Sequence, residues 1–406
     1  MGITAWNLEG VSELNRLEVF KLLVRGTVCT RVELARQTGL KQATITNIIN
    51  WFLENGVVEE TGLVRGEKGR RSIALLLKAE NYQIIGIRVT KRRFLVALHD
   101  ISGRVYLEKE YVLDFKKGGL SALSEINTAV ADVVKSKRNG RVVAIGLAIP
   151  GPYLQHEGRV AFMSEFPGWE DIYIGKKLED EFGVPVFVEH DAHAAAFAEW
   201  ANSKHPEKGA LLYINAGYGV GMGVIIDGKI YHGALGIAGE IGHMSINFSG
   251  KKCTCGNRGC LEHYCSMVEV EAKLEKWVTS NTGSSIGPKF SFDDIRKAIL
   301  AGEKYPLQLI EESAKYLGFA LANVINMYNP DTIVIDGYLA KASDRFIEVA
   351  RKTVQDLVPK LVFERVEIRS ASQSVNQFLV GAVKLAVDNI LETFDGMNLI
   401  LSEQIS

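Results

Sequence analysis

The residues best suited to chemistry lie in one short stretch of the second half of the chain. Residues 242 to 266, "GHMSINFSGKKCTCGNRGCLEHYCS", contain four of the five cysteines of the protein and two of its histidines. An odd number of cysteines with most of them clustered favours thiolate binding of a metal over a disulfide framework, and it indicates a reducing compartment. The alternative, a group of unpaired structural thiols, is disfavoured because the residues between the cysteines are polar or charged. The stretch therefore predicts a metal site.

The elements that surround this stretch differ along the chain, and the first eighty residues form one group. Three helical patterns, over residues 12–26, 30–40 and 41–56, precede two strand-like runs on either side of "TGLVRGEKGRR". Ser12 is the expected N-cap of the first helix. Thr30 and Glu33 form a predicted capping box in the second helix, which Gly39 ends. Three helices with a tight turn before the third and a terminal hairpin predict a winged helix-turn-helix.

Two sets of side chains in this unit are suited to nucleic acid. Polar side chains that can reach base edges or phosphates begin the third helix: Lys41, Gln42, Thr44, Thr46 and Asn47. Basic side chains that can lie along phosphates or in a narrow minor groove stand among glycines in the hairpin loop: Arg65, Lys68, Arg70 and Arg71. Either set alone fits a solvated helix face or a flexible linker equally well. Together they predict binding to double-stranded operator DNA, with a homodimer or a dimer of dimers on a two-part site.

Composition limits the classes of protein to which the chain can belong. Its 406 residues predict two or three domains, and 47% hydrophobic with 23% charged residues is ordinary globular usage. The formal net charge of −1 provides no overall field for nucleic acid or membranes, so DNA binding must come from a local patch. The N-terminus lacks a signal-peptide pattern, and no apolar run reaches the roughly 18 residues of a membrane span. We expect a soluble cytoplasmic protein without a membrane partner.

From residue 82 onward, strand-like and helical patterns alternate. Strands are expected at "YQIIGIRVT", "FLVALHDI", "VVAIGLAIPG" and "PVFVEH", and two glycine-interrupted strands at "ALLYINAGYGVGMGVIIDGKI". Helices are expected at "ALSEINTAVADVVKS" and "IGKKLEDEFG", and a long helix leads into a strand at "EESAKYLGFALANVINMYNPDTIVIDG". This succession predicts an α/β architecture with two lobes.

Seven motifs in this region occur in the order typical of one family: "IPGPY", "FPGW", "HDAHAAAFAE", "GYGVGMGVIIDG", "GEIGH", "CTCGNRGCLE" and "NPDTIVIDG". With these motifs the chain resembles the ROK family (repressors, open reading frames and kinases), and within it the winged-helix repressors that respond to xylose, N-acetylglucosamine or glucose. The resemblance covers nearly the whole chain and implies a fold similar to that of sugar kinases and actin, with a sugar between two lobes. It implies a DNA-binding domain over 1–80, a first lobe over 81–195 completed by the C-terminal helix, and a second lobe over 196–406 with a zinc loop at 243–260.

The resemblance also implies the residues of two sites. Four residues match the family's structural zinc ligands, one zinc per chain in a closed tetrahedral site: His243, Cys253, Cys255 and Cys260. Six residues match its sugar contacts: Glu165, His190, Asp191, Glu240, His243 and Glu262. Carboxylates suit this task because each can accept two hydroxyl hydrogen bonds. Taken alone, each of these residues fits the alternative of an ordinary surface charge equally well. Glu165 and His190 replace asparagines of the kinase pattern, so the identity of the sugar stays open.

The same comparison bears on catalysis. A ROK kinase uses an Asp-x-Gly-Gly-Thr hairpin for phosphate and magnesium, and here Arg88, Val89, Thr90, Lys91 and Arg92 take those positions. In "NAGYGVGMG" the glycines are kept but Tyr218 occupies the usual threonine, whereas Asp191, the family's catalytic base, is retained. We therefore expect a sugar-responsive repressor of carbohydrate-utilisation genes without enzyme activity. The alternative is an ATP-dependent ROK sugar kinase with an added DNA-binding domain.

Overall fold

A computed structural model describes most of the chain. The described ranges are 8–26, 30–65, 71–90, 92–113, 118–136, 140–161, 168–202, 208–281, 283–372 and 376–392. Three of the predicted site residues, Glu165, Lys68 and Arg70, lie outside these ranges. Within them, every helix is too short or too polar to cross a bilayer.

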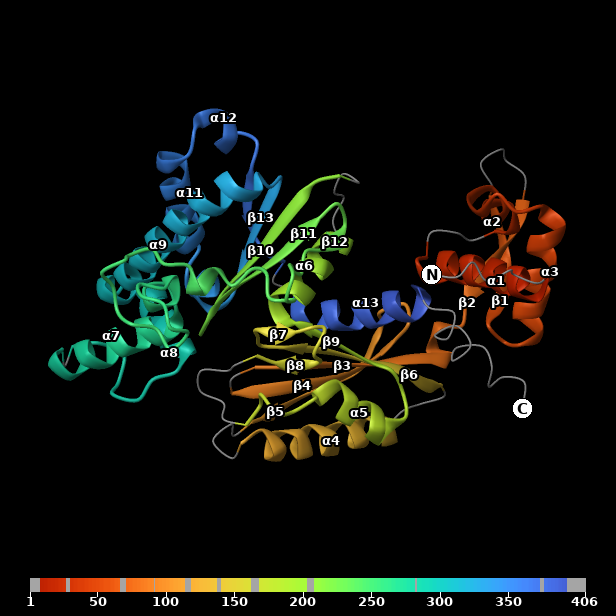
Figure 1. Cartoon of the computed structure of the whole chain (residues 1–406), viewed down its shortest axis with the longest axis horizontal. Coiled ribbons are helices and arrows are strands. Elements are labelled where there is room, and N and C mark those ends of the chain that lie inside the picture. Colours follow the sequence, from red (N-terminus) through yellow and green to blue (C-terminus); the bar gives the residue numbers. More distant parts are fainter. Residues whose placement is uncertain are drawn as a thin grey trace.

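The N-terminal unit consists of three helices followed by an antiparallel hairpin (Figure 1). Its elements are α1 (Leu8–Val24), α2 (Arg31–Thr38), α3 (Gln42–Glu54), β1 (Val58–Arg65) and β2 (Arg71–Leu77). The predicted ends of α2 are confirmed, since the Thr30 side chain accepts from the Glu33 N–H and Gly39 ends the helix at a φ of 71°. The predicted cap at Ser12 is wrong. The helix already begins at Leu8, so the N–H groups of Leu14 and Asn15, which a cap at Ser12 would satisfy, lie inside the helix and can bond to carbonyls one turn earlier.

The rest of the chain contains two five-stranded sheets with the same strand order. The first, ordered β5-β4-β3-β6-β9, comprises β3 (Tyr82–Val89), β4 (Arg93–Asp100), β5 (Val105–Val112), β6 (Arg141–Ile149) and β9 (Val186–His190). The second, ordered β12-β11-β10-β13-β14, comprises β10 (Ala210–Ala216), β11 (Val220–Ile226), β12 (Lys229–Ile230), β13 (Thr332–Asp336) and β14 (Glu367–Ser370). In each sheet three antiparallel strands come first and two parallel strands follow. The two halves therefore repeat one topology.

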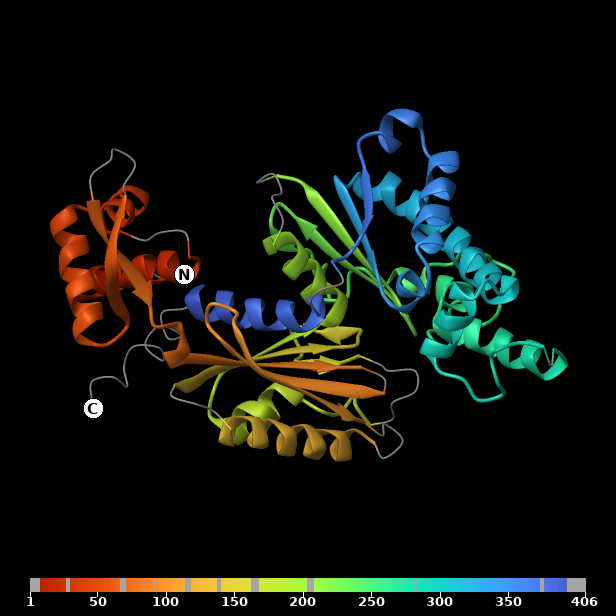
Figure 2. The same ribbon diagram turned by 180° about the vertical axis from the view of Figure 1, so that it is seen from behind.

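Helices cover the first sheet on both faces (Figures 1 and 2). α4 (Gly119–Lys135) and α5 (Ile174–Phe182) lie on one face, and α13 (Gln377–Glu392) lies on the other. The alternation of β3 explains this arrangement, since Ile85 and Ile87 pack in the core with α4 whereas Ile84 packs with α13. α6 (Asp191–Asn202) contacts α13 and also packs on the second sheet, so these two helices join the halves.

Further helices lie beyond the second sheet. Two of them, α9 (Lys304–Tyr328) and α11 (Arg345–Leu357), pack against each other, and their buried residues share one core with the strands β10, β11, β13 and β14. The remaining elements are the strands β7 (Tyr153–Leu154) and β8 (Arg159–Val160) and the helices α7 (Met267–Ser280), α8 (Phe292–Leu300), α10 (Tyr338–Ala342) and α12 (Lys360–Phe363). Short 3-10 helices occur at Ala79–Asn81, Ile241–His243 and Leu261–His263.

α13 approaches its neighbours closely because glycine lies at the contact. A Cβ atom on Gly381 would overlap the backbone carbonyl of Ala194 in α6, so only glycine fits there. Eight nonpolar residues of α13 are at least nine-tenths buried: Phe378, Leu379, Ala382, Val383, Ala386, Val387, Ile390 and Leu391. Burial at both ends of the helix fixes its position relative to the two sheets.

The N-terminal unit shares a hydrophobic core with α13 and β3. Phe20 and Ile49 of the unit are buried in one cluster with Tyr82 of β3 and Val383 and Ile390 of α13. The rings of Phe20 and Tyr82 meet edge to face at 5.7 Å between centroids. Figures 1 and 2 both show the unit beside one end of α13. The unit is thus packed onto the same helix that joins the two halves.

The first prediction compares two buried tyrosines. Among the described residues the Tyr82 hydroxyl has no hydrogen-bond partner, and burial raises the pKa of Tyr82 to about 12. Tyr213, by contrast, donates to Asp336 at 2.6 Å. Tyr82→Phe should change the free energy of unfolding by less than about 1 kcal/mol, whereas Tyr213→Phe should lower it by about 1–3 kcal/mol because a buried carboxylate loses its donor. Denaturant unfolding of both variants tests this, and equal losses would contradict it.

Candidate functional site

The cysteine-rich loop brings four metal-binding side chains together. The ligand atoms of His243, Cys253, Cys255 and Cys260 all lie within 4.8 Å of one another. The Sγ atom of Cys253 is 3.8 Å from Nδ1 of His243, and the Sγ atoms of Cys255 and Cys260 are 3.7 Å apart. Tetrahedral zinc with ordinary bond lengths separates such ligand atoms by about 3.5–3.8 Å. The donor set and its spacing therefore fit one tetrahedral ion of the size of zinc.

The backbone of the loop holds these ligands without the help of a large core. The Cys253 N–H donates to the Asn257 carbonyl at 2.8 Å, and the Asn257 side chain donates to the His243 carbonyl at 3.0 Å. Gly259 has a φ of 64°, and a Cβ atom there would overlap the Asn247 carbonyl. Cys265 lies outside the set in the hydrophobic core, where burial raises the pKa of its thiol. Among the described residues, the cluster thus comprises three cysteines and one histidine, and Cys265 lies apart from it.

Three carboxylates meet between the two halves. Asp191 is the first residue of α6, Glu240 directly precedes the 3-10 helix that carries His243, and Glu262 follows Cys260 by two residues. Burial, together with the charges of Asp191 and Glu262, raises the pKa of Glu240 to about 7. Glu262 accepts a hydrogen bond from the Val220 N–H at 3.1 Å. Such a group of convergent acceptors can bind a ligand with several hydroxyl groups.

The other predicted sugar-contact residues adjoin these carboxylates. Nε2 of His190 lies 3.4 Å from Asp191, and burial lowers the pKa of His190. The His243 N–H donates to the Glu240 carbonyl at 3.0 Å, so the carboxylate and the metal ligand belong to one turn. The structure thus gathers five of the six predicted residues, while Glu165 lies outside the described ranges. Their role as sugar contacts stays a prediction.

The β3–β4 hairpin carries arginines where a ROK kinase would have its phosphate-binding residues. The guanidinium of Arg88 lies 3.7 Å over the ring of Phe378 and donates to Asn376 at 3.1 Å. Burial lowers the pKa of Arg88, and the charges of Asp191 and Asp336 oppose that shift. Arg88 thus places a fixed positive charge near two carboxylates, which disfavours a magnesium ion at the same place.

Arg92, in the turn between β3 and β4, contacts the second half of the molecule directly. Its guanidinium lies 4.4 Å over the ring of Tyr218 and donates to the Tyr218 hydroxyl at 3.2 Å. It also forms an ion pair with Glu271 of α7 at 3.6 Å, and Tyr218 donates to Glu271 at 2.9 Å. The sequence showed that both phosphate-binding positions are replaced. It did not show that the two replacements contact each other and link the two halves.

Most of the residues that are predicted to contact DNA from the start of α3 have exposed side chains. Lys41, Gln42, Thr46 and Asn47 are exposed and Thr44 is half-buried, whereas Ile45, Ile48 and Ile49 face the core. Arg65 ends β1 and Arg71 begins β2, with the other two basic residues of the loop outside the described ranges. Their contacts with nucleic acid stay a prediction.

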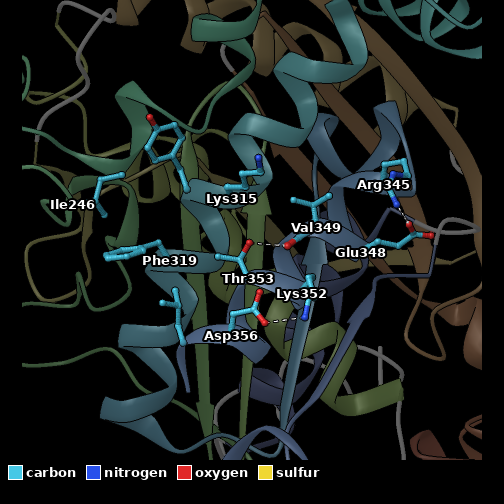
Figure 3. A pocket seen from close by; sticks show the side chains of 11 residues that line it. Ile246, Lys315, Phe319, Arg345, Glu348, Val349, Lys352, Thr353 and Asp356 are labelled. Atoms are coloured by element: carbon cyan, nitrogen blue, oxygen red, sulfur yellow. Dashed lines mark hydrogen bonds and ion pairs between the residues drawn. The ribbon is translucent and has the colours of Figure 1, made fainter. Parts of the chain in front are cut away.

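A separate groove of about 650 Å³ lies between α9 and α11 (Figure 3). Most of its charged residues pair along α11: Arg345 with Glu348 at 2.6 Å and Lys352 with Asp356 at 2.8 Å. Figure 3 shows Val349 beside these pairs and Phe319 away from them, on the side of Ile246. Because these charges neutralise one another, the groove lacks the free acceptors that the carboxylates beside Glu240 provide.

Two five-stranded sheets with the same strand order define the actin-like fold of sugar kinases, here with a helix-turn-helix unit at the N-terminus. The chain belongs to the ROK family, whose model matches residues 84–389. It is 26% identical over 385 residues to the xylose repressor of Bacillus subtilis, and this alignment covers 94% of this chain and 97% of that protein. It is also 29% identical over 345 residues to the DNA-binding transcriptional dual regulator NagC of Escherichia coli, with 83% of each chain covered.

Solved structures show the same fold. A ROK family transcriptional regulator, described as a homologue of the E. coli MLC protein, matches 98% of this chain and 100% of its own with a TM-score of 0.78 at 23% identity. A ROK family glucokinase from Streptomyces griseus, in complex with glucose and AMPPNP, matches 75% of this chain and 99% of its own with a TM-score of 0.66 at 23% identity. The fold is therefore common to regulators and kinases, and the side chains must distinguish the two.

The second prediction concerns the cysteine loop. Cys255→Ser replaces one soft thiolate ligand by a hydroxyl and should remove about one zinc ion per chain relative to the wild type. Far-ultraviolet circular dichroism should show that most helices remain. Cys265→Ala, which removes a buried thiol outside the cluster, is the matched control and should keep the wild-type metal content. Equal metal content in Cys255→Ser and the wild type would rule out this ligand set.

Proposed function

We propose that this protein is a sugar-responsive transcriptional repressor of carbohydrate-utilisation genes. The observation that carries this proposal is the combination of retained sugar-binding carboxylates with a phosphate position filled by Arg92 and Tyr218. The relatives with 26% and 29% identity are named as a repressor and a transcriptional regulator, which supports the same conclusion. The protein would bind operator DNA in the cytoplasm as a homodimer or a dimer of dimers.

The sugar would bind to the carboxylates beside α6. Asp191, Glu240 and Glu262 would accept its hydroxyl hydrogen bonds, with His190, His243 and Glu165 at the same site. The four cysteine-loop ligands would hold one structural zinc ion, which supplies a rigid centre for a polar loop. Because His243 and Glu240 share one turn, the zinc loop would fix the orientation of the central acceptor.

The same geometry argues against phosphoryl transfer. A kinase needs backbone amides and a hydroxyl close to the phosphates and a site for magnesium. Here the Arg92 and Tyr218 side chains are hydrogen-bonded to each other, and Arg88 puts a cation near Asp191 and Asp336. Asp191 alone keeps the kinase pattern, and it serves equally well as a sugar contact. A ROK sugar kinase with an added DNA-binding unit is the competing function.

DNA would be bound by the N-terminal unit. The exposed polar side chains of α3 would enter the major groove, with Arg65, Lys68, Arg70 and Arg71 of the hairpin on the phosphates. α13 offers a physical route for the response, since it packs against α6, which begins with Asp191, and against the core of the N-terminal unit. A sugar that shifts α6 would thereby move the DNA-binding unit.

One experiment separates the two functions. A duplex selected from a random pool by repeated binding would be titrated with the protein while hexoses, pentoses and their N-acetyl derivatives are added. We expect at least one sugar to change duplex affinity about 5–150-fold, with no sugar phosphorylation in the presence of magnesium and ATP. Turnover well above background would favour the kinase, and sugar binding without an effect on DNA would refute the regulator.

The third prediction uses pH at Glu240. With a pKa of about 7, this carboxyl loses its proton between about pH 6 and pH 8, and only the ionised form is an acceptor at both oxygens. Affinity for the active sugar, measured by calorimetry, should therefore rise about tenfold over this range.

Glu240→Gln keeps the shape of the side chain but does not titrate. This variant should bind the sugar more weakly, with the rise above pH 6 greatly reduced. Asp191→Asn should weaken binding and move the rise in affinity to lower pH, because Glu240 still titrates but no longer has the neighbouring Asp191 charge that helps to raise its pKa. A wild-type affinity that stays constant with pH would contradict the assignment of Glu240 as a sugar contact.

A further inference from the structure

Three ligand-type side chains converge where β9 leads into α6. Glu189 is the last residue but one of β9, His193 lies in the first turn of α6, and His232 follows β12. Nδ1 of His193 is 3.2 Å from one Glu189 oxygen, and Nε2 of His232 is 2.8 Å from the other. All three ligand atoms lie within 4.8 Å of one another. Neither the sugar contacts nor the predicted zinc loop include any of these residues.

The second nitrogen of His193 restricts what can lie between His193 and Glu189. Nε2 of His193 is 3.0 Å from the carbonyl oxygen of Ala238, which can only accept, so Nε2 must carry the proton. In a neutral imidazole Nδ1 then has a lone pair, and this lone pair faces a carboxylate oxygen. Two lone pairs at that distance repel each other. A positive species must therefore lie between them, either a second proton on His193 or a metal ion.

We propose that the positive species is a divalent transition metal ion such as zinc, bound by Glu189, His193 and His232. Imidazole nitrogens and a carboxylate oxygen are ordinary zinc ligands, and a metal-bound histidine commonly donates its other N–H to a backbone carbonyl, as His193 does to Ala238. Tetrahedral zinc would separate such nitrogen and oxygen atoms by about 3.3 Å, close to the distance between His193 and Glu189. It would also neutralise a carboxylate without placing an imidazolium in a fully buried position.

The surroundings provide access and a fourth ligand. Glu189 and His232 line a cavity of about 600 Å³, from which a water molecule can complete the coordination. His193 is completely buried, whereas the side chain of His232 is 36% exposed. His232 can therefore move outward by the half ångström that metal binding requires relative to its present contact with Glu189. The metal would tie the loop that leads to Glu240 to the start of α6.

The test is the metal content of the full-length protein. After equilibration with zinc and removal of loosely bound ions, the wild type should contain about two zinc ions per chain. His232→Gln can keep a hydrogen bond to Glu189 but cannot replace an imidazole ligand, so it should fold normally and contain about one ion fewer. Cys255→Ser should also lose one ion, from the other site, and the two losses should add.

Cobalt distinguishes the two sites by spectroscopy. In cobalt-loaded protein the thiolate-to-metal absorption should survive in His232→Gln and fall strongly in Cys255→Ser. One zinc ion in the wild type would overturn the proposal, because the positive species would then be a proton and the three residues a hydrogen-bonded group only. Two ions in both the wild type and His232→Gln would also overturn it, because the second ion would be bound elsewhere.

Discussion

The packing of α13 is the constraint on which the rest of the molecule depends. This one helix covers a face of the first sheet, contacts α6 across Gly381 and completes the core of the N-terminal unit. Asp388, near its C-terminal end, lies close enough to Arg25, which directly follows α1, and to Lys21 of α1 that their positive charges oppose the burial that raises the pKa of Asp388. A core that is shared in this way cannot change at one end without a change in packing at the other. In the proposed function, the helix would therefore couple the carboxylate site to the N-terminal unit by close packing.

The second determinant is the pair of replacements at the phosphate position. At the two positions where the kinase pattern has threonines, Arg92 and Tyr218 join the two halves by a cation–π contact and a hydrogen bond, with Glu271 bonded to both. Contacts of this kind contribute about 0.5–2 kcal/mol each, enough to bias the relative position of the halves without locking it. In the proposed regulator, the residues that replace the kinase threonines would thus also supply the contact between the halves.

Sequence patterns predicted the periodic elements well. The helices around Ile45 and Ile126 and the strands around Ile85 and Ile145 have apolar residues at helical or strand spacing, and the structure confirms them. The strand β5 was missed, because an edge strand with charged residues such as Glu108 and Lys109 lacks the apolar alternation of a buried strand.

The site was predictable only where a motif fixed the residues. His243 and the three cysteines share one short loop, and the structure brings them together as expected. Glu189, His193 and His232 do not form such a motif, since His232 joins the others only when β12 packs beside α6. The contact between Arg92 and Tyr218 spans 126 residues and likewise requires the folded arrangement of both halves. Local spacing carries no information about such pairs.

The most direct test of signal transmission through α13 is to measure how DNA affinity responds to sugar in the variant Ile390→Ala. Ile390 of α13 is buried in the core shared with the N-terminal unit, far from the carboxylates in sequence, so truncation should loosen the coupling and leave the sugar site intact. Ile299→Ala, in the separate core of the second half, is the matched control. Sugar affinity should be unchanged in both variants, and the sugar-induced change in duplex affinity should shrink severalfold in Ile390→Ala alone. A full response in Ile390→Ala would show that α13 does not transmit the signal.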